Sequence, residues 1–350
     1  MKMRLPTRQS TSTFAVAYAL VALIALSTYC MGQESLVTPE ADEAAHRGLA
    51  FLAARQHPSG SFGQGSEQYR GNVAVSALCG LAFLAGGSTP DEGPYGEQVS
   101  NILDYLLLHS EESGLVVYKP GALQRGPMYG HGLATLFLAE CYGMAPDRED
   151  LRPKLDAAVR LIISVQNEQG GWRYATDSDD ADISVTVAQI MALRAAKNAG
   201  LHVPNTTIEN CIEYVTQCQN PDGGFMYQLP SGVSDFARTA MGIASLQSAG
   251  VYEGPELEAA FEYMEQFRPR PGLNASKESY FFFGHYYAVQ AFRFEGGGAW
   301  PRWYASVRDE MTSQQEPDGS WESAISVDYA TACACIVLQT PNNYLPIFRR

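Results

Sequence analysis

Four carboxylates lie within six residues of one another, at Asp177, Asp179, Asp180 and Asp182. Crowded carboxylates can hold a proton above its ordinary pKa, as a general acid at neutral pH requires. Asp182 also stands directly before the apolar stretch that begins at Ile183, where an aspartate can cap a helix. We therefore predict Asp182 as a proton donor with Asp180 as its neighbour. A solvated acidic loop that ends in a helix cap is the alternative.

Asp182 belongs to a series of polar residues at the beginning of apolar, small-residue stretches. The series is Asn72, His131, Asp182, Asp235, His285 and Asp328, with intervals of 43 to 59 residues. Asparagine and aspartate are preferred helix caps, so Asn72, Asp235 and Asp328 have capping as an alternative role. Histidine caps poorly and suits proton transfer. The predicted catalytic residues are Asp182, Asp180, His131, His285 and Asp235.

If these stretches are helices around one cavity, their first residues meet at one mouth. The side chains of Asp182, Asp235, His131 and His285 would then lie within roughly 10 Å of a common centre, because packed helices are about 8–10 Å apart. Such a cluster serves either proton transfer or a divalent cation. Converging helix N-termini oppose a cation, so we predict proton transfer with a histidine as the partner of Asp182, and neither a metal nor a cofactor.

Aromatic side chains are dense near the same predicted mouth. Such a pocket suits an isoprenoid, because ring faces stabilise its carbocations. It equally suits a sugar ring, and the rings could instead simply pack the turns. The predicted ligand-binding residues are Tyr129, Trp172, Tyr174, Phe236, Tyr286, Tyr287, Asp328 and Tyr329.

A repeated turn positions these residues. In four segments a glutamine is followed six residues later by an aromatic residue, with glycine shortly before the ring: Gln56–Phe62, Gln166–Trp172, Gln219–Phe225 and Gln315–Trp321. Each turn ends an amphipathic helical stretch and precedes a stretch that is apolar all round. The amphipathic helices are expected near Ala45, Ile102, Leu155, Ile208, Leu257 and Trp303.

Six pairs of helices that cannot bury their faces alone must stack on their neighbours. One helix of each pair is apolar on every side, which favours inner helices ringed by outer ones. We predict an all-α fold, a single (α/α)6 toroid of alternating inner and outer helices from about residue 36 to 350. An open helical solenoid is the competing arrangement.

Turns of the Gln-x-x-x-Gly-Gly-Trp type resemble the repeats of squalene and oxidosqualene cyclases, protein prenyltransferase β subunits and related terpenoid-cyclase toroids. More closely, Met128–Cys141 and Thr340–Phe348 resemble exported prenyltransferase/squalene oxidase repeat proteins of planctomycete-type bacteria, whose activity is unassigned. The resemblance covers nearly the whole mature chain and implies the α/α-toroid fold. It specifies architecture much better than chemistry.

Class II terpenoid cyclases place an Asp-x-Asp-Asp motif at an inner-helix start, where the middle aspartate protonates an alkene. Residues 177–180 match this motif but lie before the predicted helix, whereas residues 180–183 fit the helix position and end in Ile183. The zinc site of protein prenyltransferases resembles Asp-x-Cys and Tyr-His. The matching positions here, residues 182–184 and 329–330, lack the thiolate and the imidazole, so protein prenylation is not expected.

Residues 1–32 have the charge, apolar core and small-residue order of a secretory signal, with the apolar run over residues 14–26. We predict that this signal is cleaved and that residues 33–350 form the toroid domain, exported to the periplasm or the extracellular space. Lipid attachment at Cys30 is a minor alternative. No apolar run in the mature chain is long enough for a stable membrane span.

The chain of 350 residues is 46% hydrophobic and carries a formal net charge of −14 without a cluster of lysine and arginine. A nucleic-acid partner is therefore not expected, and protein partners are not predicted. The six cysteines outside the signal are predicted to be buried core thiols, because no spacing supports a zinc site.

Three function classes remain open. The first is binding of an isoprenoid or other apolar ligand in the central cavity, with cyclase-like isomerase or lyase chemistry at Asp182 if the chain is an enzyme. The second is a non-catalytic binding or scaffold module, and the third is carbohydrate processing by two carboxylates. Deep apolar cavity walls would favour the first class. A cavity filled by side chains would favour the second class, and a shallow polar groove would favour the third.

Overall fold

The computed structural model describes residues 36–63, 69–119, 126–270 and 280–349. The chain divides into two units, Met1–Thr38 and Pro39–Arg350, and the described residues lie almost wholly in the second. The predicted signal over residues 1–32, with the lipid alternative at Cys30, falls outside the described residues. Within the described ranges, no helix combines the length and apolar character that a membrane crossing needs.

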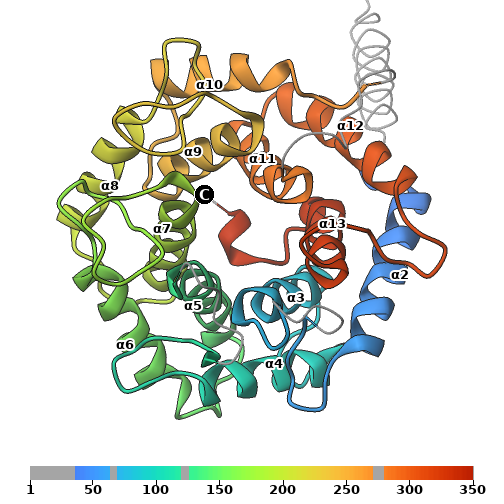
Figure 1. Cartoon of the computed structure of the whole chain (residues 1–350). Helices are drawn as coiled ribbons and strands as arrows, with labels where there is room; N and C mark the ends of the chain where they lie inside the picture. Colours follow the sequence, from blue (N-terminus) through green and yellow to red (C-terminus); the bar gives the residue numbers. More distant parts are fainter. Residues whose placement is uncertain (1–35, 64–68, 120–125, 271–279, 350) are drawn as a thin grey trace, which may run out of the picture. The chain divides into compact units, whose positions relative to one another are not determined.

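An inner ring of helices surrounds the axis of the second unit (Figure 1). Its members are α3(Val73–Ala85), α5(Met128–Tyr142), α7(Ile183–Asn198), α9(Phe236–Ser248), α11(Phe281–Glu295) and α13(Val327–Gln339). Every residue of α3 is buried, as is every residue of α13 after Val327. Burial on all sides is what a helix with apolar residues all round requires, which confirms the prediction for the inner ring.

An outer ring of helices covers the inner one (Figure 1). Its members are α2(Pro39–Arg55), α4(Gly96–Leu108), α6(Leu151–Ser164), α8(Asn205–Gln217), α10(Pro255–Glu265) and α12(Ala299–Ser313). Each buries one face only. Helix α6, for example, buries Leu151, Leu155, Ala158, Val159 and Ile162, which recur at the spacing of one helix stripe.

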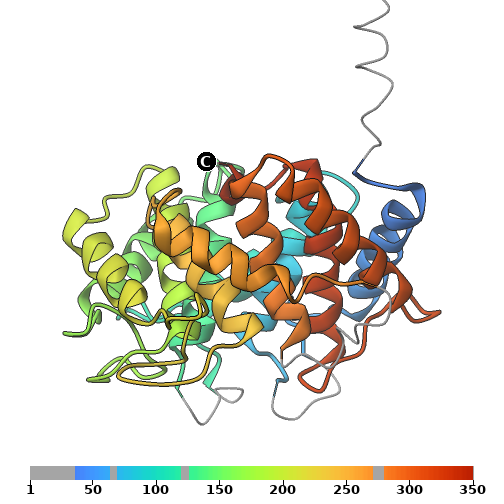
Figure 2. The ribbon, with the colours of Figure 1, turned by 90° about the horizontal axis from the view of Figure 1, so that it is seen from above.

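The two rings close on themselves. Each inner helix packs against the next along the chain, and α13 packs against both α3 and α2, which joins the last repeat to the first. The predicted closed toroid of alternating helices is therefore confirmed, and the open solenoid is wrong. Seen from the side, the C-terminal end of the chain lies at one face of the ring, opposite the loop that precedes α9 (Figure 2).

The repeated turns do more than end the outer helices. In each of the four, the glutamine Nε2 donates to the carbonyl of the glycine four residues later, and also to a carbonyl near the beginning of the next outer helix. The second acceptors are Gln98 for Gln56, Thr207 for Gln166, Glu256 for Gln219 and Ala44 for Gln315. Because Gln315 reaches Ala44 of α2, the fourth turn fastens the closure of the ring.

A fifth turn of the same shape joins α4 to α5, and the sequence search missed it. Ser110 and Val116 stand in place of the glutamine and the ring, and they form the same bridge that Gln219 forms with Phe225. Gly114 has φ +91°, close to the +89° of Gly170 in the second turn. The backbone geometry is preserved, but both side chains that define the motif are replaced.

All six cysteines in the described part are buried free thiols, as predicted: Cys79, Cys141, Cys211, Cys218, Cys333 and Cys335. Burial raises the pKa of each of these thiols above the ordinary value. A thiol that resists ionisation is a poor nucleophile and a poor metal ligand. These side chains therefore act as small apolar groups in the core.

Candidate functional site

Three residues of the predicted series cap inner helices. Asn72 Oδ1 accepts from the amides of Ala74 and Val75 at the beginning of α3. Asp182 caps α7 and Asp235 caps α9. Each has an extended backbone and a side-chain oxygen on the first free amides, which is what helix capping requires.

The other three members of the series lie inside their helices, which corrects the predicted alignment. His131 is the fourth residue of α5, His285 the fifth of α11 and Asp328 the second of α13. The cap of α13 is Ser326, whose side chain accepts from the Tyr329 amide. Asp328 is therefore not a cap.

His131 takes the place of a hydroxyl group in the repeat. In the four glutamine turns, the amide of the ring residue donates to a serine or threonine one turn inside the next inner helix: Ser76, Thr186, Thr239 and Thr331. In the fifth turn the Val116 amide donates instead to His131 Nδ1 at 3.1 Å. The sequence comparison aligned this histidine with the caps, whereas it aligns with the hydroxyl position.

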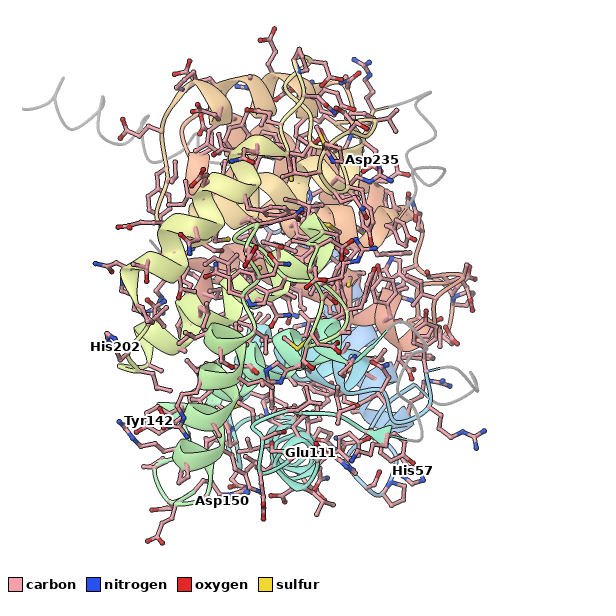
Figure 3. The ribbon with its side chains drawn as sticks, turned by 60° about the vertical axis from the view of Figure 1, so that its left-hand side comes forward. His57, Glu111, Tyr142, Asp150, His202 and Asp235 are labelled. Atoms are coloured by element: carbon pink, nitrogen blue, oxygen red, sulfur yellow. The ribbon has the colours of Figure 1, made fainter. Side chains whose placement is uncertain are left out.

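His285 and Asp328 face the layer between the two rings. His285 packs against the rings of Phe236, Phe281 and Trp303, the last from outer helix α12. Asp328 accepts from Arg55 of outer helix α2 at 2.6 Å and from the Gly63 amide at 2.9 Å. Figure 3 shows Asp235 on one side of the ring, with Tyr142 and His202 on the other.

Asp182, Asp235, His131 and His285 each have partners outside their own group of four. Among the described residues no hydrogen bond or ion pair joins any two of them, and no group of three or more His, Cys, Asp or Glu could hold a metal ion. Burial lowers the pKa of His131 to about 4 and that of His285 to about 3, so both imidazoles are neutral at neutral pH. Their positions fit packing better than proton transfer.

Asp182 is fully buried, and its two carboxylate oxygens differ in their surroundings. Oδ1 accepts from the Ser184 amide at 2.9 Å, the Ser184 hydroxyl at 2.5 Å and the Val185 amide at 2.9 Å. Oδ2 lies 3.6 Å from Arg173 Nε and has no hydrogen-bond partner among the described residues. Burial raises the pKa of Asp182 above its ordinary value, against the opposing effects of Ser184, Val185 and Arg173. The carboxylate is held as a cap through Oδ1, and burial keeps Oδ2 away from solvent.

Asp180 is joined to Asp182 through a guanidinium. Arg173 Nη1 lies 3.1 Å from Asp180 Oδ2, and the Asp180 side chain is half exposed. Arg173 also stacks near the ring of Tyr227, whose hydroxyl donates to that of Tyr174 at 3.3 Å. The two aspartates are neighbours as predicted, but the Arg173 guanidinium lies between them.

Two of the predicted ligand-binding rings pack between the two helix layers. Trp172 is buried, and its Nε1 donates to the Ile162 carbonyl of α6 at 2.8 Å. Phe236 is buried against His285 and stacks on Trp303. These rings connect inner helices to outer ones, and neither faces the axis.

Four of the remaining predicted rings gather inside the ring around Phe283, which was not predicted as a site residue, whereas Tyr174 lies beside Tyr227 and Arg173. The ring centroids of Tyr129, Tyr287 and Tyr329 lie 5.7, 4.8 and 5.8 Å from that of Phe283, and Tyr286 stacks on it at 5.7 Å. Tyr129 belongs to α5 and Phe283 to α11, which are not neighbours in the ring. Their contact therefore crosses the interior, and side chains fill it at this level.

The interior is also filled towards the other face, by the last residues of the chain. We call Asn343–Arg349 the C-terminal strap; Figure 1 shows it inside the inner ring. It includes the short 3-10 helix η4(Pro346–Phe348), which packs against α7 and α11. Leu345, Ile347 and Phe348 are 1%, 2% and 3% exposed. The position of this segment inside the ring was not predicted from the sequence, in which residues 340–348 indicated only a resemblance to exported repeat proteins.

Charged side chains of three inner helices hold the strap by its main chain. Arg194 of α7 donates to the Arg349 carbonyl at 2.5 Å, and Arg293 of α11 to the Phe348 carbonyl at 3.3 Å. Glu140 of α5 accepts from the Ile347 amide at 3.4 Å. Burial raises the pKa of Glu140 from 4.5 to about 7, against the opposing effects of the Ile347 amide, Arg194 and Arg349.

Glu140 gives a prediction for the dependence of stability on pH. Because its folded pKa lies above the ordinary value, the stability gained from its protonation is complete below about pH 4.5 and is lost as the pH rises through about 7. We expect Glu140→Gln, which cannot ionise, to match the wild-type free energy of unfolding at low pH and to exceed it by about 3 kcal/mol above pH 8. Urea unfolding at the two pH values measures the difference.

The matched control for this prediction is Glu149→Gln, because Glu149 is exposed beyond the end of the same helix. It should leave the free energy of unfolding unchanged at both pH values. A gain for Glu140→Gln that is the same at both pH values would contradict the assigned titration.

Comparison with known proteins gives the same architecture. Residues 3–264 match the family model of the prenyltransferase alpha-alpha toroid domain. A drimenyl diphosphate synthase of Streptomyces showdoensis is 26% identical over 178 residues, which make up 50% of this chain and 30% of that protein. The chain thus spans about a third of the length of this curated relative.

Solved structures with the same arrangement include enzymes of two kinds. The type II terpene cyclase MstE from Scytonema, solved with geranylgeranyl dihydroxybenzoate, has TM-score 0.60 and 16% identity, over 87% of this chain and 98% of that one. The GH76A α-1,6-mannanase of Salegentibacter sp. HEL1_6 has TM-score 0.63 and 10% identity, over 86% and 99%. At these identities the likeness shows the shared fold alone.

Proposed function

We propose that this chain, which belongs to the prenyltransferase alpha-alpha toroid domain family, is an exported, non-catalytic binding module that holds an apolar ligand inside its ring. The filled interior carries the non-catalytic part of this proposal, and a ligand would enter the ring by replacing the strap. Phe283 and its tyrosines occupy one level of the ring, and the strap occupies the other. Export rests on the signal-like residues 1–32.

The surroundings of Asp182 argue against cyclase chemistry. A general acid must bring its proton to within hydrogen-bond reach of the reacting atom. Asp182 is 0% exposed, its Oδ1 is taken by Ser184 and Val185, and its Oδ2 lies 3.6 Å from Arg173 without a hydrogen-bond partner among the described residues. Burial raises the pKa of Asp182, but a carboxyl group without exposed surface cannot reach a ligand. The two histidines predicted as its partners contact the Val116 amide and the ring of Trp303 instead.

An apolar ligand fits what lines the interior. The strap contributes aliphatic and aromatic side chains, and a ligand that took its place would meet the same apolar surroundings. An isoprenoid is the ligand that the comparisons support, since MstE is a terpene cyclase solved with a geranylgeranyl compound. Binding without turnover is nonetheless what the filled interior and the engaged Asp182 favour.

Carbohydrate processing has one observation in its favour. A shallow polar hollow lies at the second turn, lined by side chains that include Asn167, Glu168, Asp177 and Asp179. It is open and lies outside the inner ring, where a sugar could bind. Glycoside hydrolysis, however, needs two carboxylates that flank one bond, with one kept protonated by its surroundings.

Turnover tests the proposal directly. Full-length chain incubated with geranylgeranyl diphosphate is expected to leave the probe unchanged, as measured by gas chromatography and mass spectrometry after removal of the phosphates. The Asp180→Asn and Asp182→Asn variants are expected to give the same result. Conversion by the wild type that Asp182→Asn abolishes, with the melting temperature preserved, would overturn the proposal and make Asp182 a catalytic acid.

A further inference from the structure

The strap is bound through groups that any extended polypeptide has. Arg194 and Arg293 donate to two successive main-chain carbonyls, and Glu140 accepts from a main-chain amide. The buried side chains of Leu345, Ile347 and Phe348 enter apolar surroundings. Main-chain contacts give a peptide site affinity without fixing its sequence, and the apolar positions give it selectivity.

One polar group at this site is not satisfied by the strap. Arg194 is 9% exposed, and its Nη1 has no hydrogen-bond partner among the described residues, although its Nη2 is bound to the Arg349 carbonyl. A guanidinium presents a planar fork that matches a carboxylate through two parallel hydrogen bonds. A carbonyl oxygen at this position uses one arm of the fork, whereas a carboxylate would use both.

The charges around the strap also suit an anion. Two arginines of the inner ring, Arg194 and Arg293, lie beside the strap with one carboxylate, that of Glu140, in a chain whose formal net charge is −14. Arg194 is further held in place over the ring of Phe294, at 4.6 Å from its centroid. A rigid, partly desolvated cation of this kind binds a carboxylate more strongly than an exposed one does.

The strap is joined to the inner ring by an exposed connection. Asn343 has φ +60°, in the left-handed region, and Tyr344 is 53% exposed. Between α13 and Leu345, the side chains therefore make few buried contacts, so the strap can leave without unpacking the helices. A competitor that satisfies Arg194 better could take its place.

We propose that this end of the ring is a binding site for the free C-terminus of another polypeptide, which the strap occupies in the absence of that partner. The terminal carboxylate would bind Arg194 at the place of the Arg349 carbonyl, with a bulky apolar residue next to last, where Phe348 lies, and a main-chain amide on Glu140. This inference rests on the proposed function of a binding module, and it names the ligand class.

The test uses a synthetic peptide that copies residues 343–349, labelled with fluorescein at its N-terminus and ending in a free carboxylate. Its fluorescence anisotropy is measured with the full-length chain and with full-length Phe348→Ala, which weakens the competing strap. We expect binding to the variant to be at least about tenfold tighter than to the wild type, since an occupied site lowers the apparent affinity. Phe348→Leu is a milder second variant, should the alanine variant lose its helical circular dichroism.

Two controls isolate the carboxylate. The same peptide ending in an amide is expected to bind the strap-weakened variant about tenfold more weakly. Adding Arg194→Gln to that variant should bring the two peptides to equal affinity. Equal affinity of both peptides before this change, or no binding to a folded strap-weakened variant, would overturn the inference.

A further arm separates this inference from the proposed function. Geranylgeraniol is added to the complex of the labelled peptide and the strap-weakened variant. Displacement by geranylgeraniol at concentrations below those needed for the unlabelled peptide would assign the site to an isoprenoid chain and overturn the peptide assignment. Turnover of geranylgeranyl diphosphate, by contrast, would contradict the proposed function whatever the peptide does.

Discussion

Replacing Gly170 with alanine is expected to lower the free energy of unfolding by at least about 4 kcal/mol, because two separate costs add. Gly170 has φ +89°, a region that side chains other than hydrogen rarely adopt. An added Cβ would also lie 2.3 Å from the Asn210 carbonyl oxygen of α8, a backbone atom that cannot move without displacing the helix. Guanidinium unfolding followed by circular dichroism measures the loss.

Gly200 provides the matched control for this experiment. It lies just beyond the end of α7 with φ +83°, and a Cβ there would meet nothing within 4 Å. Gly200→Ala therefore keeps the backbone cost and removes the collision, so we expect a loss of about 1 kcal/mol. Equal losses in the two variants would show that the turn is not packed against α8 as closely as described.

The large expected effect follows from the role of the turn as a joint. Gln166 fastens the Gly170 carbonyl and the Thr207 carbonyl of α8 at the same time, at 2.7 and 2.9 Å. A turn displaced by a methyl group would lose both hydrogen bonds. The contact between one repeat and the next would then be weakened. Because each repeat of a closed ring is stabilised by its neighbours, this loss lowers the stability of the whole ring.

The repeats and their closure could be predicted because each depends on local pattern. The helices that are apolar all round became the inner ring, and the one-sided helices became the outer ring. The glutamine turns are recognisable because their spacing is fixed by the carbonyls that Gln56 and its counterparts must reach. The turn at Gly114 was not predicted, because its side chains differ from the motif. Val116 replaces the aromatic residue, and its amide donates to His131 instead of a serine or threonine.

The candidate site could be predicted only in part, because side-chain direction depends on the tertiary structure. Asn72 and Asp182 were placed correctly at helix starts, since capping is a local property. His131 and His285 were aligned with them on sequence spacing alone, and a shift of one turn put both in the inter-ring layer. The strap could not be foreseen, because its contacts join residues far apart in the chain, such as Glu140 and Ile347.

Asp182→Ala is the second substitution with a large expected effect, about 3 kcal/mol of unfolding free energy. It removes the oxygen that accepts from the Ser184 amide and hydroxyl and from the Val185 amide, at a helix start where Asp182 and Val185 are buried and Ser184 is partly buried. Donors left unpaired in the core carry their full desolvation cost, which exceeds that of an exposed cap. Urea unfolding of the full-length chain measures this loss.

The conservative variant and the neighbouring aspartate make the test specific. Asp182→Asn keeps an acceptor oxygen, and Asn72 already caps α3 with an amide, so we expect it to recover all but about 1 kcal/mol. Asp180→Ala removes the half-exposed partner of the same Arg173 and should cost less than about 0.5 kcal/mol. If Asp182→Ala proved as mild as Asp180→Ala, the carboxylate would be dispensable as a cap, and its burial at the start of α7 would need another reason, such as the proton transfer that its position first suggested.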